Sequence, residues 1–338
     1  MEKYLVKKIK PFDPSKAKTV EDVLVGLQTC SFQGRNLGQA LEVLTSMITD
    51  KCFRVLTLAG AMVPAGMEEI ICQLIERKIV HAIVSTGANI IHSIINTLEP
   101  KDKQVHYIGS PSVDDRDLNK YQIDRVYDTY LREPDYWKSE DLILDKLVKD
   151  FGKDKPIMMT ASEFFAWMSK YLSGRSFVKV AADHGVSVFN PAFSDSELGL
   201  DAARFRKFSG VKLVIDDVGD IDKYAELLMK YRKFGTIILG GGVPRNWTQQ
   251  IFPYLENIAE RKGLKEVQTF TGFDYSVRFH TAVAEDGGLS GCTLSEGVSW
   301  GKYQHDAKYA SVWVDSTIAF PIVVTALFQR LDRLGIKS

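Results

Sequence analysis

The sequence lacks the patterns that define several large classes of protein. Its four cysteines are scattered over 338 residues without a C-x-x-C pair, so neither a zinc site nor a disulfide framework is indicated. Its 43 basic and 43 acidic residues cancel, so no long-range field would draw the chain to nucleic acid or to an anionic membrane. The composition therefore favours a small-molecule or protein partner in a reducing, cytoplasmic setting.

Long hydrophobic runs are also missing. The N-terminus has no apolar signal core, and the most apolar stretch, residues 318–328, is too short to cross a bilayer. We therefore expect no membrane partner. Because the stretch contains Pro321, it predicts a buried helix with the proline in its first turn.

Apolar runs of strand length alternate with helical patterns through most of the chain. This alternation predicts a doubly wound, mostly parallel, Rossmann-like α/β sheet, in which ligands bind at the carboxyl ends of the strands. We expect helices at residues 67–77, 141–151, 161–171, 220–231 and 318–334. We expect strands at residues 53–59, 80–85, 105–108, 186–189, 211–215, 236–239, 266–271 and 310–314, several of them continuous apolar runs.

Two segments are predicted to differ from this regular pattern. Residues 1–50 are expected to form an N-terminal helical extension, with Thr19 capping a helix, and residues 51–338 to form the α/β catalytic domain. Residues 110–136 are polar and predict an excursion from the sheet. The charged residues expected on its solvated face are Asp114, Asp115, Arg116 and Asp117.

Four predicted strand ends carry small or flexible residues, at 59–66, 85–89, 239–246 and 286–288. Glycine permits close approach of a phosphate to the backbone, and a helix N-terminus offers unpaired N–H groups. None of these loops matches G-x-G-x-x-G or G-x-x-x-x-G-K-[ST], and a glycine run is also typical of a tight turn. Four such loops together favour a nucleotide or similar cofactor.

Several polar residues near strand ends have two interpretations. Asp195 suits turn and helix-cap chemistry as well as ligand binding, and Asp315 is placed to cap the final helix. His280 falls within an apparent strand, and no H-E-x-x-H pattern is present, so a core or edge histidine is favoured over a metal ligand. No metal site is predicted.

The most informative stretch is Glu296-Gly297-Val298-Ser299-Trp300-Gly301-Lys302. A carboxylate anchors an ammonium, an indole face attracts a cation, and a desolvated lysine forms imines. Tryptophan beside a glycine turn is also common in packing, and most lysines are solvated. Together with the four loops, the run predicts an amine site in which Lys302 is the nucleophile, with a lowered pKa.

The chain resembles the deoxyhypusine synthase family, including its bacterial deoxyhypusine-synthase-like branch, over residues 20–335. The resemblance is carried by residues 188–195, 237–243, 314–321 and above all 296–302. It implies NAD-dependent transfer of an aminobutyl group from a polyamine such as spermidine, through an imine on Lys302, to an acceptor amine. The acceptor is either a protein lysine or a small amine that gives a homospermidine-like product. A homotetramer with sites between subunits is also implied.

The same resemblance assigns roles to particular residues. It places Glu296, Trp300 and Asn246 in the polyamine pocket. The cofactor positions that it implies are Thr86, Gly87, Asp195, Gly241, Gly242, Thr281, Ala282, Asp286, Gly287, Ser290, Asp315 and Ser316.

The chain departs from the family pattern in the pocket. Leu200 and Leu289 stand where acids are expected, and each lost carboxylate removes a partner for an ammonium. Altered polyamine recognition is therefore expected, while capture by Lys302 is retained. The other departures are Asn246 for a histidine, His92 for a glutamate, and Gly60, Ala61 and Pro64 for polar residues.

Two other hypotheses remain. In the second hypothesis, the chain is a non-catalytic regulatory relative that binds NAD or an amine and has a decayed polyamine site. The presence of Glu296, Trp300 and Lys302 together argues against this hypothesis. An NAD-consuming deacylase is the third hypothesis, which the missing zinc-binding cysteine pattern disfavours.

Overall fold

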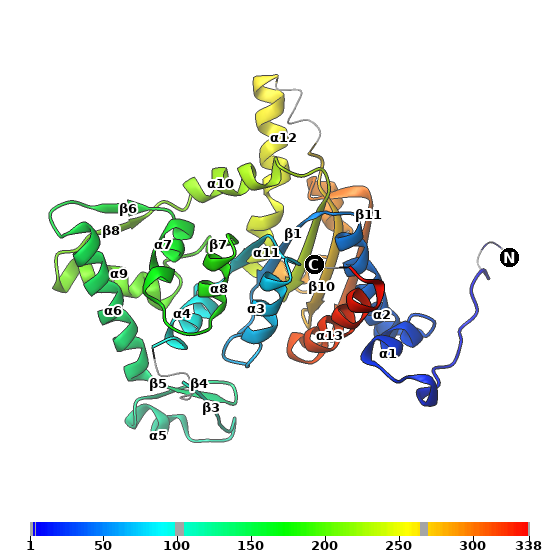
Figure 1. Cartoon of the computed structure of the whole chain (residues 1–338), viewed down its shortest axis with the longest axis horizontal. Helices are drawn as coiled ribbons and strands as arrows, with labels where there is room; N and C mark the ends of the chain where they lie inside the picture. Colours follow the sequence, from blue (N-terminus) through cyan, green and yellow to red (C-terminus); the bar gives the residue numbers. More distant parts are fainter. Residues whose placement is uncertain (1–2, 4, 99–104, 264–269, 337–338) are drawn as a thin grey trace. The chain divides into compact units, whose positions relative to one another are not determined.

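The computed structural model describes residues 3, 5–98, 105–263 and 270–336. The chain divides into two compact units (Figure 1). Unit 1 comprises Met1–Thr57, Arg77–Val80 and Ala225–Ser338, and unit 2 comprises Leu58–Glu76 and His81–Tyr224. None of the helices in the described ranges has the length and apolarity needed to span a bilayer.

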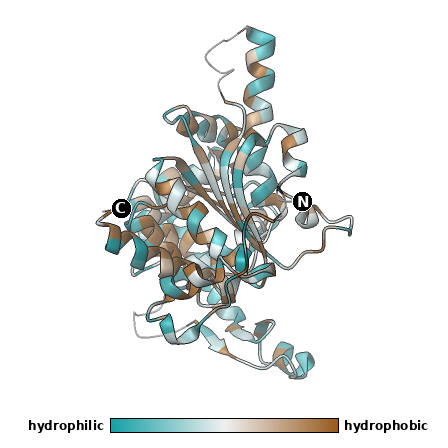
Figure 2. Ribbon diagram, turned by 90° about the vertical axis from the view of Figure 1, so that its right-hand side faces the viewer, coloured by the Kyte–Doolittle hydropathy of each residue, from teal (hydrophilic) through white to brown (hydrophobic). Residues whose placement is uncertain are grey.

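A mostly parallel sheet of six strands confirms the predicted fold class. Its strand order is β11-β10-β9-β1-β2-β7, and the pairs β10/β11, β9/β10 and β2/β7 are parallel. Every residue of β1 and β9 is buried, as expected for strands covered on both faces, and Figure 2 shows the apolar colouring of the strands. The strands are β1 (Phe53–Leu58), β2 (Ala82–Ser85), β7 (Ser187–Phe189), β9 (Phe234–Leu239), β10 (Phe273–His280) and β11 (Tyr303–Trp313).

Unit 1 contains strands β9, β10 and β11 with helices packed on them. Helix α2 packs against β10 and β11, and α13 packs against α1 and α2. The predicted cap of the first helix is confirmed, because Thr19 and Asp22 form a reciprocal capping box at the start of α1. The helices of this unit are α1 (Val20–Leu27), α2 (Phe32–Thr49), α11 (Gly242–Gln249), α12 (Ile251–Lys262) and α13 (Ser316–Leu334), with the short turns η1 (Pro14–Lys16), η4 (Leu289–Gly291) and η5 (Glu296–Trp300).

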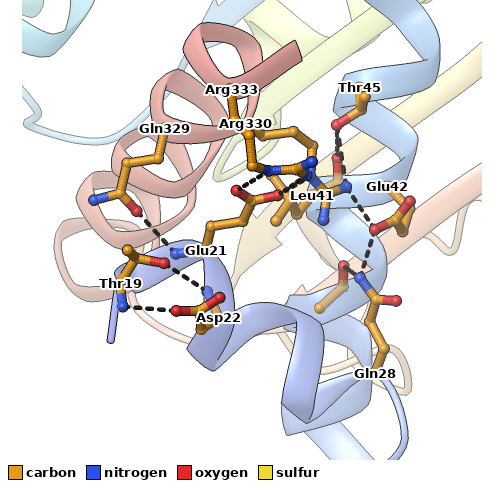
Figure 3. Close-up of polar contacts among 11 residues, drawn as sticks. Thr19, Glu21, Asp22, Gln28, Leu41, Glu42, Thr45, Gln329, Arg330 and Arg333 are labelled. Atoms are coloured by element: carbon orange, nitrogen blue, oxygen red, sulfur yellow. Dashed lines mark hydrogen bonds and ion pairs between the residues drawn. The ribbon is translucent and has the colours of Figure 1, made fainter. Parts of the chain in front are cut away.

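A buried ion pair joins the N-terminal helices to the last helix. Arg330 of α13 donates from Nε to Glu21 Oε1 at 2.8 Å and from Nη1 to Glu42 Oε1 at 2.5 Å, and Arg333 also reaches Glu21 (Figure 3). Glu21 and Arg330 are each about 6% exposed. The hydrogen bonds of Arg333 lower the pKa of Glu21 against the opposing effect of burial, and those of Arg330 add to the lowering. The charges therefore stabilise one another out of water.

Unit 2 contains β2 and β7, two smaller sheets and a larger set of helices. The smaller sheets are the antiparallel β3-β5-β4 and the parallel pair β6-β8. The strands of these sheets are β3 (His106–Ile108), β4 (Ile123–Val126), β5 (Thr129–Arg132), β6 (Ile157–Met159) and β8 (Leu213–Ile215). The helices are α3 (Glu68–Glu76), α4 (Gly87–Ile95), α5 (Asp115–Lys120), α6 (Glu133–Phe151), α7 (Ala161–Met168), η2 (Ser169–Tyr171), α8 (Phe177–Asp183), α9 (Glu197–Phe208) and α10 (Gly219–Leu228), which ends across the unit boundary.

Some predicted elements differ from the structure. The strands at 105–108 and 211–215 exist, but they belong to the small sheets, where Ile108 and Val214 are exposed. The excursion at 110–136 is confirmed, and its four charged residues at 114–117 are exposed. Helix α6 begins at Glu133 rather than 141, because Pro134 is suited to the first turn. The strand predicted at 266–271 lies largely outside the described residues.

The predicted position of Pro321 in its helix is wrong. Asp315 caps α13, so the helix begins at Ser316 and Pro321 lies inside it rather than in the first turn. Proline lacks the N–H that a residue at this position donates to the preceding turn. The buried residues Ala319, Phe320, Val323 and Val324 hold this segment by packing.

The buried ion pair leads to a prediction about stability. Replacing Glu21→Gln leaves the half-exposed Glu42 as the only carboxylate paired with Arg330 among the described residues, so the free energy of unfolding should fall by up to about 3 kcal/mol. In urea titrations the difference from the unmodified protein should shrink as the pH falls below the ordinary glutamate pKa, since the lowered pKa stabilises only the ionised form. The control is Asp332→Asn, on the same helix, whose pair with Arg77 is largely exposed and should contribute under about 1 kcal/mol. Equal effects of the two variants would contradict a buried, stabilising pair.

Candidate functional site

Lys302 lies at the junction between the turn η5 and strand β11. Gly301 ends η5 with a φ of 68°, a left-handed conformation that glycine adopts without strain. The Lys302 Nζ donates a hydrogen bond to Asn246 Oδ1 at 3.0 Å and lies 5.8 Å from the centre of the Trp300 ring. Residues 296–302 and helix α11 therefore come together at the Lys302 amine.

The environment of Lys302 lowers its pKa, in the predicted direction. Burial is the main cause, because a charged amine loses hydration there, and the charge of Arg245 acts in the same direction. Cys292 and Glu296 act against this shift. A larger fraction of the amine is therefore uncharged, and so nucleophilic, than in an exposed lysine.

The other two pocket residues of the run are exposed in the single chain. The Trp300 side chain is 65% exposed, and Glu296 is exposed at the start of η5. Within unit 1, Trp300 is therefore largely open to water. Both side chains remain free to contact a ligand.

Two buried arginines hold the glycine-rich segment next to Lys302. Arg278 of β10 donates from Nε to Gly240 O at 3.0 Å, from Nη1 to Cys292 O at 2.9 Å, and from Nη2 to Ser290 O. Arg245 of α11 donates from Nη1 to the same Cys292 O at 2.9 Å. The sequence analysis missed both residues. The sequence does contain a signal for Arg278, because it stands within the strand-like residues 275–279 and arginine is rarely buried without a specific role.

The predicted cofactor positions of unit 1 fall at the ends of its parallel strands. Ser290 Oγ accepts a hydrogen bond from Gly242 N at 3.0 Å. A Cβ at Gly241 would lie 2.9 Å from Ser290 Oγ, so the residues after β9 and the turn η4 are in direct contact. Thr281 and Ala282 follow β10, which pairs in parallel with β9.

The remaining predicted positions of unit 1 have local structural contacts. Asp286 Oδ1 accepts from Gly288 N at 2.7 Å, which forms a tight turn around exposed Gly287. Asp315 accepts from Thr317 N at 2.7 Å, so the capping interpretation is confirmed. Ser316 Oγ donates to Phe279 O at 3.3 Å.

His280 is the last residue of strand β10, at the carboxyl end of that strand. Its Nε2 is 2.9 Å from Ser311 Oγ, and burial lowers its pKa to about 4. No cluster of three metal-ligating side chains occurs in the part of the chain that the structure describes.

The predicted cofactor positions of unit 2 gather around the start of α4. Asn89 donates to Gly60 O at 2.6 Å and to Thr86 Oγ1 at 3.2 Å, which joins the loop after β1 to the loop after β2. A Cβ at Gly87 would lie 2.3 Å from the Cβ of Ser196, so the loop after β7 is also in contact. Asp195, next to Ser196, is exposed. The sequence analysis gave Asn89 no role of its own, although its side chain holds the two loops together.

The neighbouring residues 200 and 201 have opposite environments on α9. Leu200 is 52% exposed, whereas Asp201 is 1% exposed and binds Arg204, which also binds Glu197 and Glu140. Successive helical residues point about 100° apart, so the acid at 201 does not replace one at 200. Leu289, the other predicted departure, is 48% exposed in unit 1.

His92 forms a buried polar chain in unit 2. Its Nδ1 is 2.9 Å from His106 Nε2, and its Nε2 is 3.4 Å from the Tyr136 hydroxyl. Burial lowers the pKa of His92 to about 3 and that of His106 to about 4. Both imidazoles are therefore neutral at pH 7, so His92 cannot supply the charge of a glutamate.

The family model and the curated relatives agree on one family. The family model for deoxyhypusine synthase matches residues 22–327. "Probable deoxyhypusine synthase 2" of Methanosarcina acetivorans is 36% identical over 94% of this chain and 89% of its own length. "Deoxyhypusine synthase-like protein" of Chlorobaculum parvum is 35% identical over 90% of this chain and 85% of its own. A crystal structure assigned as an Entamoeba histolytica deoxyhypusine synthase superposes with a TM-score of 0.60 at 19% identity, covering 95% of this chain and 97% of that one. That structure shows the shared fold.

The close contact at Gly87 can be tested by substitution. Gly87→Ala would force its Cβ against Ser196, and this overpacking should lower the free energy of unfolding by about 1–3 kcal/mol. Gly287→Ala is the matched control, since no atom lies within 4 Å of its added Cβ, and it should change stability by under about 0.5 kcal/mol. Urea unfolding of both variants measures the difference. An undisturbed Gly87→Ala would show that the loops do not pack as described.

The burial of Asp201 predicts a pH dependence. Burial raises its pKa to about 7, against the attraction of Arg204. The folded protein then holds a proton that the unfolded chain releases near pH 4, so the contribution to stability is present at low pH and is lost as the pH rises through about 7. Asp201→Asn should remove this loss. Between pH 5 and pH 8 its stability should rise by about 1 kcal/mol or more relative to the unmodified protein, as measured by urea unfolding at each pH.

Proposed function

Because the chain belongs to the deoxyhypusine synthase family, we propose that it transfers an aminobutyl group from a polyamine to an acceptor amine, with Lys302 as the nucleophile. One observation carries the proposal: a half-buried amine with a lowered pKa is held by Asn246 beside the Trp300 ring. An enzyme that stores a carbon fragment as an imine needs such an amine.

In each unit, the residues assigned to the cofactor include a helix N-terminus that suits a phosphate group. Helices α4 and α11 begin at Thr86–Gly87 and Gly241–Gly242, and neither N-cap residue caps its helix with its own side chain, although the Gly242 N–H is bonded to Ser290 Oγ. First-turn N–H groups without caps suit phosphate oxygens, and glycine lets a ligand approach the backbone. By contrast, α1, α7, α8 and α13 are capped by their own side chains. When bound, NAD would accept a hydride from the carbon attached to the secondary nitrogen of the polyamine and later return it.

The chain's own part in the reaction is nucleophilic catalysis by Lys302. Its uncharged Nζ adds to the oxidised carbon of the donor, the bond from that carbon to the departing diamine breaks, and the departing nitrogen takes up the proton that Lys302 loses. The acceptor amine then adds to the same carbon, and the bond to Lys302 breaks as Nζ regains a proton. The imine left on the acceptor would need a hydride, which bound cofactor would supply, and the overall transfer would then be redox-neutral.

Glu296 and Trp300 are assigned to the donor amine. The carboxylate of Glu296 would pair with an ammonium of the polyamine, and the indole would attract its charge. Since both side chains are exposed in one chain, a homotetramer that covers this surface would supply the dry environment the step requires. The proposed assembly therefore completes the pocket.

The altered pocket residues bear on the donor and the acceptor. Leu200 and Leu289 are exposed, and the acid of Asp201 is occupied by Arg204, so fewer carboxylates are available than in the family pattern. This observation favours a donor or acceptor with fewer ammonium groups, such as a small amine acceptor that gives a homospermidine-like product. It also supports the second candidate, a non-catalytic relative with a decayed polyamine site.

The test is covalent trapping. Incubation with NAD, spermidine and borohydride should add an aminobutyl group to the peptide that contains Lys302, detected by mass spectrometry. Lys302→Arg should abolish trapping and lower product formation at least about 1,000-fold, because the guanidinium stays protonated and cannot form the imine. It should leave the dissociation constant for NAD within about threefold.

The control is Lys308→Arg, an exposed lysine of the same strand, which should retain full trapping. Full turnover by Lys302→Arg would remove Lys302 from the mechanism. No reduced nicotinamide and no adduct with any polyamine of a panel would support the non-catalytic candidate.

A further inference from the structure

Arg245 and Arg278 are buried cations without an acidic partner. They are 3% and 1% exposed, and among the described residues no carboxylate forms an ion pair with either. The buried Arg330, by contrast, is paired with Glu21. A buried positive charge is costly unless a compensating contact or a function retains it.

Backbone carbonyl oxygens provide the compensating contacts. Arg278 binds Gly240 O, Ser290 O and Cys292 O, and Arg245 binds Cys292 O as well, so one carbonyl receives both guanidinium groups. The segment between Ser290 and Cys292 has little regular structure of its own, and these bonds fix it against α11 and β10. Carbonyl dipoles reduce the cost of the charges but leave their net charge of two in place.

This charge lies beside the proposed nucleophile. Arg245 directly precedes Asn246, whose Oδ1 receives the hydrogen bond from Lys302 Nζ. The two arginines also act on each other, since burial first and then the charge of Arg245 lower the pKa of Arg278 to about 10. The electrostatic potential around the Lys302 amine is therefore raised by the fixed charge of Arg245.

We propose that Arg245 and Arg278 are positioning residues that hold the Ser290–Cys292 segment against α11 and β10, and that Arg245 places a fixed positive charge next to Asn246, the residue that holds the Lys302 amine. The use of that amine rests on the proposed function, but the arrangement itself does not. The charge would increase the uncharged fraction of the amine, the form that acts as a nucleophile.

Cys292, Glu296 and Asn246 also act on the Lys302 amine. Cys292 and Glu296 favour the charged amine, and Asn246 is a neutral acceptor that carries no charge of its own. Arg245 is the cation that acts on Lys302 from α11. Neutralising Arg245 should thus leave burial as the only one of these effects that still opposes Cys292 and Glu296.

The experiment measures the protonation of Lys302 without any polyamine or NAD. Reductive methylation by formaldehyde and cyanoborohydride requires the uncharged amine, so the methylated fraction of the Lys302 peptide, followed by mass spectrometry from pH 6 to pH 11, reports the pKa. Exposed Lys308 in the same digest serves as the internal reference. Because neither substrate nor cofactor is present, the result is independent of whether aminobutyl transfer occurs.

Charge and hydrogen bonding are separated by paired variants. Arg245→Gln keeps a donor but loses the charge, and the midpoint for Lys302 should rise by about half to one pH unit. Arg245→Lys keeps the charge and should move the midpoint by less than about 0.3 unit. Arg278→Lys keeps the charge but loses two of its carbonyl contacts, so amide hydrogen exchange at 286–292 should accelerate about tenfold while the midpoint stays within about 0.3 unit.

The matched control is Arg54→Met. Arg54 is also buried and binds carbonyl oxygens, those of Ile79, Met47, Cys52 and Lys78, at the start of β1 rather than near Lys302. It should lower stability and leave the Lys302 midpoint unchanged. An unchanged midpoint in Arg245→Gln with circular dichroism intact, or an equal shift in Arg245→Lys, would overturn the electrostatic role. Unchanged exchange in Arg278→Lys would overturn the positioning role.

Discussion

The contact of the Arg278 guanidinium with three backbone carbonyls is the constraint on which the Lys302 region depends. Gly240 ends β9, and Ser290 and Cys292 belong to an irregular segment whose carbonyls have no sheet partners. Buried backbone groups must be hydrogen-bonded, and a planar guanidinium with five donors can satisfy several from one side. Because the arginine is paired with carbonyls rather than carboxylates, its charge is retained at the site.

The parallel strands determine where the predicted cofactor residues lie within each unit. In unit 1 the residues after β9 and β10 follow strands that run side by side, so Gly241, Gly242 and Thr281 come from the same edge. In unit 2 the loops after β2 and β7 meet, with Gly87 packed on Ser196. Each unit thus presents helix N-termini and glycine backbone at strand ends, which is where α/β proteins bind nucleotides.

The sequence predicted the elements whose side chains follow a regular pattern. Strands β1 and β9 were found because strands buried on both faces are continuous apolar runs, and the capping box at Thr19 was found because it has a local signature. The small sheets were not separated from the central one, because a short strand such as 105–108 does not show which strand it pairs with. Pro321 was misplaced because the capping of α13 by Asp315 decided where the helix begins.

The order of residues in the chain determined the Lys302 run, the glycine loops and the fold class, since these depend on neighbours in sequence and on periodicity. Only the tertiary structure decided the environment of each group: that Asp201 turns inward to Arg204 while Leu200 faces solvent, and that Arg278, 24 residues before Lys302, anchors the segment beside it. The reason is physical. A pKa, a desolvated charge and a satisfied carbonyl depend on distances between residues remote in sequence, which no local pattern records.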